Sequence, residues 1–316
     1  MAEIRQGREP GLFEFETADL RGVLQADGTT HGIRSLVHRA YPEQDLINPH
    51  LYALNLYRLL AADALLGAAR TTPHKSRLID GGVEVTWTPA PGCAVAIRTR
   101  YEVKDPNIID LMIVLRTDAS YPAFELFVAS YFVRAFVPHV FVRHTRHEHD
   151  AGTPILVRPA VNDTTQGCYH AFPRDAASAR LFYDGRWEHG PHPIHFTATR
   201  HYAYPIGLYA DPASRLACAI FAQQDDCFGI DTTYAHDDSD DDVAAHNSLY
   251  FSLFGQDTSP GWMKTTRLRL VLTEVTGGFE TLIQQYEQFD GQGSGVGGQG
   301  SGKEAGKEDR TQLSLL

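Results

Sequence analysis

Apolar and charged residues alternate strictly in TTRLRLVL, residues 265–272, and this pattern leaves little choice of local structure. Successive side chains of a β-strand point to opposite faces of the sheet. Leu268 and Leu270 would therefore face one side, while Arg267 and Arg269 face the other. The segment predicts a long strand with one buried face and one solvated face.

Runs of β-branched and aromatic residues recur along most of the chain, separated by turn signals such as APG and KDPN. Such runs are typical of strands. Strand and helix patterns that alternate along the chain would indicate a Rossmann fold, and the sequence has no such alternation. It therefore predicts an all-β fold, a large antiparallel β-supersandwich with a short C-terminal helix. The expected strands span residues 83–89, 93–103, 108–117, 124–133, 179–185, 195–210, 215–223, 248–256 and 265–275.

Helical periodicity is found in two segments. Residues 48–69 are the main candidate, although their first part is also compatible with a strand and a loop. Residues 279–291 have a short amphipathic pattern that ends at Gly291. The expected apolar stripe of this helix consists of Phe279, Leu282, Ile283, Tyr286 and Phe289.

Length and composition set the domain organisation. The chain has 316 residues, of which 43% are hydrophobic, enough to bury a substantial core. We expect one β-sandwich domain over residues 1–290. From residue 291 glycine and serine dominate, so residues 291–316 are expected to form a disordered tail.

Charge and cysteine usage exclude several classes of function. With 39 acidic and 28 basic residues, the chain has a formal charge of -11. This charge disfavours binding to nucleic acid or to anionic membranes. The four cysteines are far apart and form no CxxC pair, which favours free thiols and a reducing compartment. No run of about 18 apolar residues occurs, so we expect a cytoplasmic protein without a membrane span.

Cofactor motifs are also missing from the sequence. No GxGxxG or GxxxxGK[ST] follows a predicted strand, and we therefore expect no nucleotide cofactor, nor any other cofactor. The acidic run YAHDDSDDD, residues 234–242, lacks the glycine of a calcium-binding loop, so a solvated acidic loop is favoured. The sequence leaves the oligomeric state open.

Three segments carry a resemblance to a known superfamily. FEFETADLRGVLQADGTTHGIRSLVHRA (13–40), RYEVKDPNIIDLMIVLRT (100–117) and HNSLYFSLFGQDTSPGWMKTTRLRLVL (246–272) resemble, in this order, the opening hairpins, a central strand pair and the closing pair of the galactose mutarotase-like superfamily. That superfamily includes aldose epimerases, polysaccharide lyases and carbohydrate-facing domains of some hydrolases. The resemblance implies a β-supersandwich whose concave sheet face holds a sugar.

The resemblance also implies candidate catalytic residues. Aldose epimerases pair a histidine acid in the middle of the chain with a glutamate base near the C-terminus. The candidates here are His246, which lies later in the chain, and Glu274, which lies in an expected late strand. A fold does not determine a reaction, so the residues of the site have to be weighed separately.

Four histidines lie in FVPHVFVRHTRHEHD, residues 136–150. On a strand, His147 and His149 share one face, and His139 or Asp150 could add a third metal ligand. A transition metal needs three or four convergent ligands, and the sequence identifies only two. We therefore expect no metal site. A polar strand end facing solvent and a position on the rim of a sugar cleft remain the alternatives for His147 and His149.

A second group of aromatic, histidine and arginine side chains lies between residues 168 and 205. Sugar sites use this mixture, because an aromatic face packs against the C–H face of a pyranose while histidine or arginine binds hydroxyls or carboxylates. Ordinary core tyrosines and tryptophans are the alternative interpretation. His50, in INPHLYALN, is a further candidate. The residues singled out are Tyr169, His170, Trp187, Arg200, His201 and Tyr202.

The sequence thus favours a carbohydrate-active enzyme that moves a proton on a sugar or uronate ring by general acid–base catalysis. Epimerisation at the anomeric carbon is one version. The other is β-elimination of a uronate, with Tyr169 or Tyr202 as base. A non-catalytic sugar-binding protein is the alternative. The expected catalytic residues are His170, His246, Tyr169, Tyr202 and Glu274, and the expected substrate-binding residues are His50, Trp187, Arg200, His201, His147 and His149.

One geometric condition separates catalysis from binding alone. Proton transfer to and from the same sugar needs two titratable side chains within roughly 7 Å of each other on the concave face.

Overall fold

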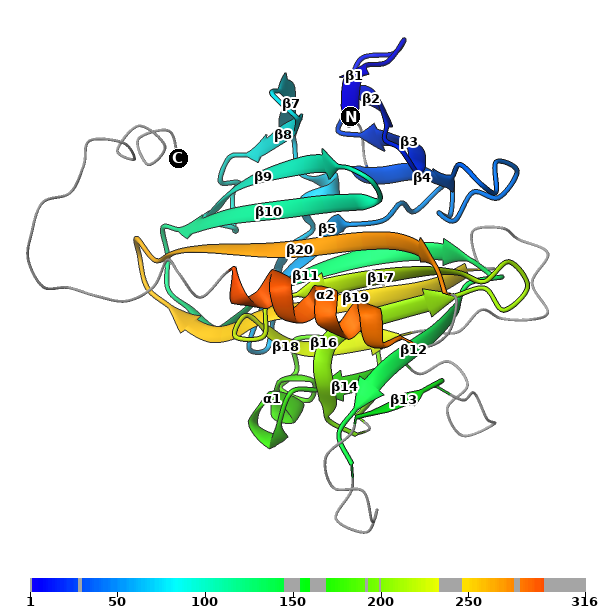
Figure 1. Ribbon diagram of the computed structural model, residues 1–316. Coiled ribbons are helices and arrows are strands. Elements are labelled where there is room, and N and C mark those ends of the chain that lie inside the picture. The colour runs from blue at the N-terminus through cyan, green and yellow to red at the C-terminus, as the bar shows by residue number, and fades with distance from the viewer. Residues whose placement is uncertain are drawn as a thin grey trace, which may run out of the picture.

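The computed structural model describes residues 2–27, 30–144, 154–159, 169–190, 193–198, 200–232, 246–275 and 279–292, and every structural statement below concerns these residues. Three β-sheets hold nearly all of the regular secondary structure of the described chain (Figure 1). The predicted all-β sandwich is confirmed. Beyond Gln292 the predicted tail lies outside the described residues.

The largest sheet has nine strands, and every neighbouring pair is antiparallel. In spatial order its strands are β13 (Ile155–Val157), β12 (Val137–Val142), β16 (Tyr202–Ala210), β17 (Leu216–Ala222), β20 (Met263–Glu274), β10 (Ile108–Thr117), β9 (Val95–Lys104), β8 (Gly82–Trp87) and β7 (His74–Ile79).

The second sheet has seven strands and lies against the first. It is antiparallel except for the β14–β15 pair. In spatial order its strands are β15 (Phe196–Ala198), β14 (Tyr169–Pro173), β18 (Cys227–Thr232), β19 (His246–Thr258), β11 (Tyr121–Val133), β5 (Asn55–Ala61) and β6 (Ala64–Gly67), and the short 3-10 helix η1 (Ala69–Thr71) follows β6.

The N-terminal sheet consists of successive hairpins, as expected for residues 13–40. Its four strands are β1 (Glu3–Gln6), β2 (Leu12–Glu16), β3 (Leu20–Gln25) and β4 (Gly32–His38).

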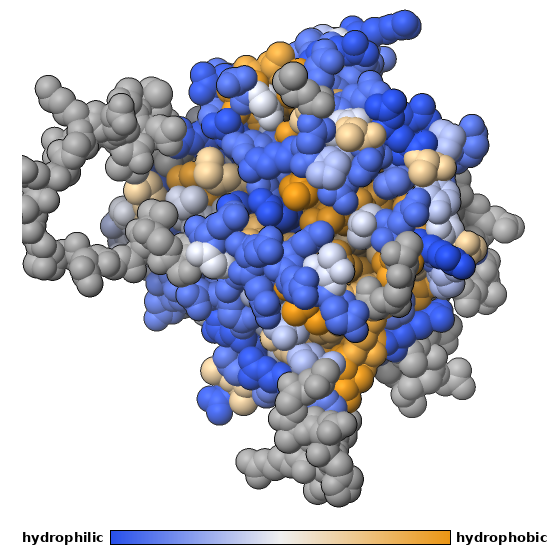
Figure 2. Space-filling view, in the orientation of Figure 1, coloured by the Kyte–Doolittle hydropathy of each residue, from blue (hydrophilic) through white to orange (hydrophobic). Residues whose placement is uncertain are grey.

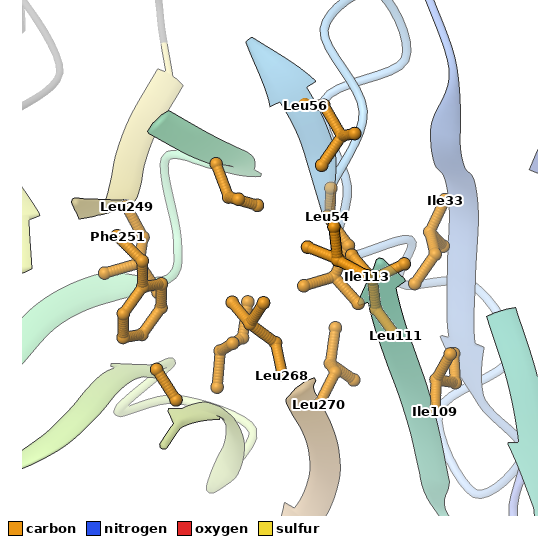
Figure 3. Packing of buried hydrophobic residues seen from close by; sticks show 14 of the residues in the cluster. Ile33, Leu54, Leu56, Ile109, Leu111, Ile113, Leu249, Phe251, Leu268 and Leu270 are labelled. Carbon is orange, nitrogen blue, oxygen red and sulfur yellow. The ribbon is translucent and has the colours of Figure 1, made fainter. Parts of the chain in front are cut away.

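The main core fills the space between the two large sheets. Leu249 and Phe251 of β19 point into it from the seven-stranded sheet, and Leu268 and Leu270 of β20 point into it from the nine-stranded sheet (Figure 3). The predicted alternation of β20 is confirmed, because its leucines are fully buried while Arg267 and Arg269 are only partly buried. Burying one face of each sheet against the other removes most of the apolar surface from water.

The predicted C-terminal helix is confirmed as α2 (Glu280–Gly291). It lies across the outer face of the nine-stranded sheet (Figure 1). Leu282, Tyr286 and Phe289 are buried and form a cluster with residues of β16, β17 and β20. The apolar stripe read from the sequence is therefore the face with which the helix docks.

The helix expected over residues 48–69 is wrong, because this segment contains the hairpin β5–β6. Leu56, Leu59 and Leu60 are all buried, since β5 is covered on both faces. A strand buried on both faces reads as a continuous apolar run, and such a run cannot be told from a buried helix by periodicity alone.

The strand expected over residues 179–185 is also wrong. The chain forms a short helix there, α1 (Ala176–Leu181). Asp175 caps it, because its side chain accepts a hydrogen bond from the backbone N–H of Ser178 at 2.8 Å. An aspartate at the N-cap followed by alanines is a helix start signal that outweighs the apolar residues after it.

None of the helices among the described residues is long and apolar enough to cross a membrane. Three of the four cysteines are described, and Cys93, Cys218 and Cys227 are buried free thiols.

Candidate functional site

The outer face of the seven-stranded sheet is the face turned away from the main core. In the strand register Tyr250 lies opposite Ala129, and Asp231 lies opposite Tyr250. Ala129 and Tyr250 belong to a second cluster of buried residues, which is separate from the main core, and Asp231 lies next to this cluster. The alternate residues of the same strands point into the main core. The seven-stranded sheet is therefore packed on both sides, and its outer face carries a group of tyrosines.

Four tyrosines gather on this outer face. The ring centroids of Tyr131 and Tyr250 are 5.8 Å apart, and those of Tyr169 and Tyr250 are 5.9 Å apart. Tyr57 of β5 lies beside Phe127, at a centroid distance of 6.2 Å. Tyr57 and Tyr169 are only partly buried and bring the group to the surface of the molecule, whereas Tyr131 and Tyr250 are buried.

Two arginines lie against these tyrosines. The Arg70 guanidinium lies 4.0 Å from the centroid of the Tyr57 ring, and the Arg58 guanidinium lies 4.9 Å from it. Arg58 also donates a hydrogen bond to the Tyr57 hydroxyl at 3.2 Å. A guanidinium over an aromatic face is attracted by the negative face of the ring. We call Tyr57, Arg58, Arg70, Tyr131, Tyr169 and Tyr250 the tyrosine–arginine cluster.

Burial raises the pKa of Tyr131, Tyr169 and Tyr250 above the ordinary value of a tyrosine. Nearby phenols raise the pKa further, whereas the charge of Arg70 lowers that of Tyr131. The three phenols are therefore neutral at neutral pH and can donate their protons to hydroxyl or carboxylate oxygens.

His246 lies at one end of the cluster. Its ring centroid is 5.2 Å from that of Tyr131, in an edge-to-face arrangement. The imidazole and the phenol are two titratable groups within the distance that proton transfer on one sugar requires. The distance part of the condition is met by His246, which the resemblance suggested, and by Tyr131, which the sequence analysis did not single out.

His50 lies near the same end. The backbone N–H of Asn48 donates to the Tyr131 carbonyl at 3.0 Å, and the Tyr131 N–H donates to the Tyr52 carbonyl at 3.1 Å. The loop that carries His50 is thus held against the end of β11, and His50 itself is exposed.

Trp187 lies behind the cluster. It is only 2% exposed and packs edge-on against Phe127 and Phe196, with centroid distances of 4.6 and 5.0 Å. The Arg58 guanidinium is 5.6 Å from its ring. Its indole nitrogen is buried without a hydrogen-bond partner among the described residues. Trp187 thus packs against Arg58 in the interior, and its ring is not exposed to solvent.

The structure does not bring five of the predicted residues to this cluster. His170 lies on β14 with its side chain on the opposite face from Tyr169, because it is in register with Thr232. Tyr202 is fully buried in the main core, where its hydroxyl donates to the Cys227 carbonyl at 2.7 Å. Glu274 is exposed at the end of β20.

Arg200 and His201 lie beside the end of β12. Arg200 donates a hydrogen bond to the Arg143 carbonyl at 2.5 Å, and the His201 carbonyl accepts one from the Arg143 backbone N–H at 3.0 Å. His147 and His149 lie outside the described residues. Within the described part of the chain, no group of three or more His, Cys, Asp and Glu side chains is placed to hold a metal ion.

Sequence reasoning missed most of the tyrosine–arginine cluster. Tyr57 and Arg58 lie in the segment that was predicted to be a helix, so the pairing of this segment with β11 could not be predicted. Tyr131 and Tyr250 lie in apolar runs typical of core strands. The signal available was a tyrosine within each of those apolar runs, together with an arginine, Arg58, in an otherwise apolar strand.

A buried ion pair lies on the same outer face, beside the cluster. Arg186 Nη1 is 2.7 Å from Glu125 Oε2, and both side chains are fully buried. Arg186 also pairs with Asp184 at 2.6 Å. Ser252 donates to Asp231 at 3.1 Å, and burial raises the pKa of both Glu125 and Asp231. These groups are enclosed, so they hold the segment after α1 against the sheet.

A hollow of about 550 Å³ lies elsewhere, over the N-terminal sheet. Its lining is mostly charged and includes Glu14, Glu16, Arg21 and Asp45. None of the residues predicted to bind sugar lines it. We place the candidate site at the tyrosine–arginine cluster, because the groups suited to bind a sugar and transfer a proton converge there.

Comparison with known proteins identifies the fold but no family. No protein-family profile matches the sequence, and no curated protein matches it. Among solved structures, the chain resembles Slr1438 of Synechocystis sp. PCC 6803 (TM-score 0.53, 10% identity, covering 87% of this chain and 100% of that one). It also resembles galactose 1-epimerase from Lactobacillus acidophilus NCFM (TM-score 0.50, 10% identity, 87% and 99%).

A third similar structure is a TPR-domain containing protein from Parabacteroides distasonis ATCC 8503 (TM-score 0.51, 9% identity). The match covers 85% of this chain and 48% of that protein, so this chain spans about half the length of that relative. The fold-level resemblance to galactose mutarotases expected from the sequence is confirmed. At these identities the likeness shows the fold alone.

Proposed function

We propose that this protein is a carbohydrate-active enzyme that binds an acidic sugar at the tyrosine–arginine cluster and moves a proton on its ring. The observation that carries the proposal is the convergence of two guanidiniums, four phenols and one imidazole on one sheet face. Planar guanidiniums suit carboxylates, and phenols suit both hydroxyls and sugar C–H faces.

Arg70 supports an acidic ligand most strongly. Its side chain lies over Tyr57 and is partly exposed, and it forms no ion pair with any described residue. A cation at a partly desolvated site attracts an anion more strongly than it would in bulk water, because the local dielectric constant is lower. A uronate would place its carboxylate against Arg70 and its ring against the tyrosines.

The acid–base pair suits β-elimination. His246 would accept the proton on the carbon next to the uronate carboxylate, and Arg70 would stabilise the negative charge that then develops. The C–O bond to the neighbouring sugar would break with formation of a carbon–carbon double bond. Tyr131 is buried and neutral because its pKa is raised, and it would give its proton to the leaving oxygen once the substrate displaces the side chains that cover it. Protons and electrons balance without a further reactant.

Galacturonan and a neutral galactan of equal length test this proposal. The double bond formed from galacturonan absorbs in the ultraviolet, so turnover can be followed directly. We expect turnover of galacturonan only, and a loss of at least about 100-fold for Tyr131→Phe and for His246→Gln with little change in KM. Binding without turnover would favour a non-catalytic sugar-binding protein. Turnover that survives both substitutions would contradict the proposed roles.

A further inference from the structure

The outer face of β7, β8, β9, β10 and β20 is rich in arginine and lysine. The register of the five strands shows which side chains share this face. Eight of them are cations and three are carboxylates, on a chain whose net charge is -11. We call this set the basic face: Lys75, Arg77, Arg98, Arg100, Lys104, Arg116, Arg267 and Arg269, with Glu84, Glu102 and Asp110.

The basic face adjoins α2 on the side of the molecule that Figure 2 shows, where hydrophilic residues predominate around the helix. The Arg267 guanidinium lies 4.4 Å from the ring of Phe289 of α2 and donates to the Phe289 carbonyl at 2.8 Å, so α2 marks the border of the face. The Arg77 side chain is 66% exposed and that of Lys104 is 44% exposed. The cations away from α2 are thus accessible to a partner.

Carboxylates hold several of these cations in place, including Asp118, which pairs with Arg116 at 3.2 Å beyond the end of β10, but the cations outnumber them. Arg77 pairs with Glu84 at 2.6 Å, and Arg100 pairs with Glu102 at 2.6 Å. Asp110 is shared between Lys104 and Arg269, since both lie within 2.8 Å of its oxygens. Anchored guanidiniums lose less side-chain entropy when they bind an anion than free ones would.

The cations of one row stand on alternate strands. Arg77 of β7, Arg100 of β9 and Arg267 of β20 share a row, with Glu84 and Met112 between them. Neighbouring strands are about 4.8 Å apart, so neighbouring cations of this row are about 10 Å apart. A polyanion with negative charges about 10 Å apart would therefore contact two cations of this row at once.

We infer that the basic face is a docking surface for an acidic polysaccharide chain, separate from the tyrosine–arginine cluster. The choice of a carbohydrate as the polyanion rests on the proposed function. Single-stranded nucleic acid is disfavoured, because the outward rows of these five strands carry no aromatic ring on which bases could stack. The face lies on the opposite sheet from the cluster, so it holds a distant part of the polymer or a second chain.

Binding of soluble galacturonan to the full chain tests this inference, measured in an Arg70→Gln background so that the cluster does not contribute. The double variant Arg77→Gln/Arg100→Gln should weaken binding roughly tenfold, equivalent to about 1.4 kcal/mol, and binding should also weaken as salt is added. The matched control is Arg5→Gln/Arg21→Gln, which removes the same charge from the N-terminal sheet and should leave the affinity unchanged.

Lys75→Gln/Arg77→Gln, confined to the edge strand β7, repeats the test without disturbing the Arg100–Glu102 pair, and melting curves confirm folding. Three results would overturn the inference. These are an equal loss in the control, an unchanged affinity in both basic-face variants, or tighter binding of an oligonucleotide than of galacturonan. Failure of the enzymatic proposal would instead appear as absent turnover by the wild type, which keeps Arg70, while polymer binding to the basic face persists.

Discussion

Replacing Arg186 by methionine should strongly destabilise the protein. Arg186 and Glu125 are both fully buried, and their Nη1 and Oε2 atoms are 2.7 Å apart. Methionine fills much of the same volume but leaves the Glu125 carboxylate without its cation. Removing one partner of a buried ion pair costs about 3–5 kcal/mol, since the remaining charge is not compensated. Loss of the bonds from Arg186 to Asp184 adds less, because Asp184 is partly exposed.

The loss should depend on pH. Burial raises the pKa of Glu125 in the folded protein, and Arg186 opposes this effect. Without Arg186 the folded-state pKa rises further above the unfolded value. A carboxyl group with a raised folded pKa contributes its stability below the unfolded pKa, and that contribution is lost as pH rises through the folded pKa. The variant should therefore be closest to the wild type in acid, where Glu125 is protonated in both proteins.

Urea unfolding of wild type, Arg186→Met, Glu125→Gln and the double variant measures the effect. The double variant should recover at least half of the loss, because no buried charge is left unpaired. A loss below about 1 kcal/mol for Arg186→Met, or a loss that does not change with pH, would refute this account of the buried pair.

Two further predictions concern buried polar groups. Burial raises the pKa of Asp231 well above its ordinary value, so the contribution of Asp231 to stability is present in acid and is lost as pH rises. Urea unfolding at a series of pH values should show a smaller decline in stability for Asp231→Asn than for the wild type. An unchanged decline would contradict the raised pKa of Asp231. Tyr202→Phe should lower the free energy of unfolding by about 1–3 kcal/mol, because the Cys227 carbonyl loses its hydrogen-bond donor at 2.7 Å, and turnover should stay unchanged. A loss of turnover without a loss of stability would restore Tyr202 as a catalytic candidate.

The fold could be predicted from the sequence where one face of a strand or helix is exposed to solvent and the other face is buried. The alternation in β20 and the apolar stripe of α2 are local patterns, and both were read correctly. The prediction for residues 48–69 was wrong because β5 is covered on both faces. The alternation of polar and apolar residues that identifies a strand is therefore missing from this segment.

The candidate site was predictable only in part. His246 and Tyr169 were singled out and lie in or beside the cluster, whereas Tyr202 has the same residue type and points into the core. Which face a tyrosine occupies depends on strand register, and register is set by pairing with residues far away in the sequence. The partners Arg58 and Tyr131 come from β5 and β11, whose pairing no local pattern reveals.

Calorimetric titration of galacturonate and of galactose into wild type and Arg70→Gln tests the central claim most directly. Glutamine keeps much of the side-chain length of Arg70 but removes its charge, and Arg5→Gln on the N-terminal sheet is the matched control. The account predicts that wild type and the control bind galacturonate, that Arg70→Gln binds it at least about tenfold more weakly, and that galactose binds all three proteins alike. Equal galacturonate affinity in wild type and Arg70→Gln would show that the tyrosine–arginine cluster is not an acidic-sugar site.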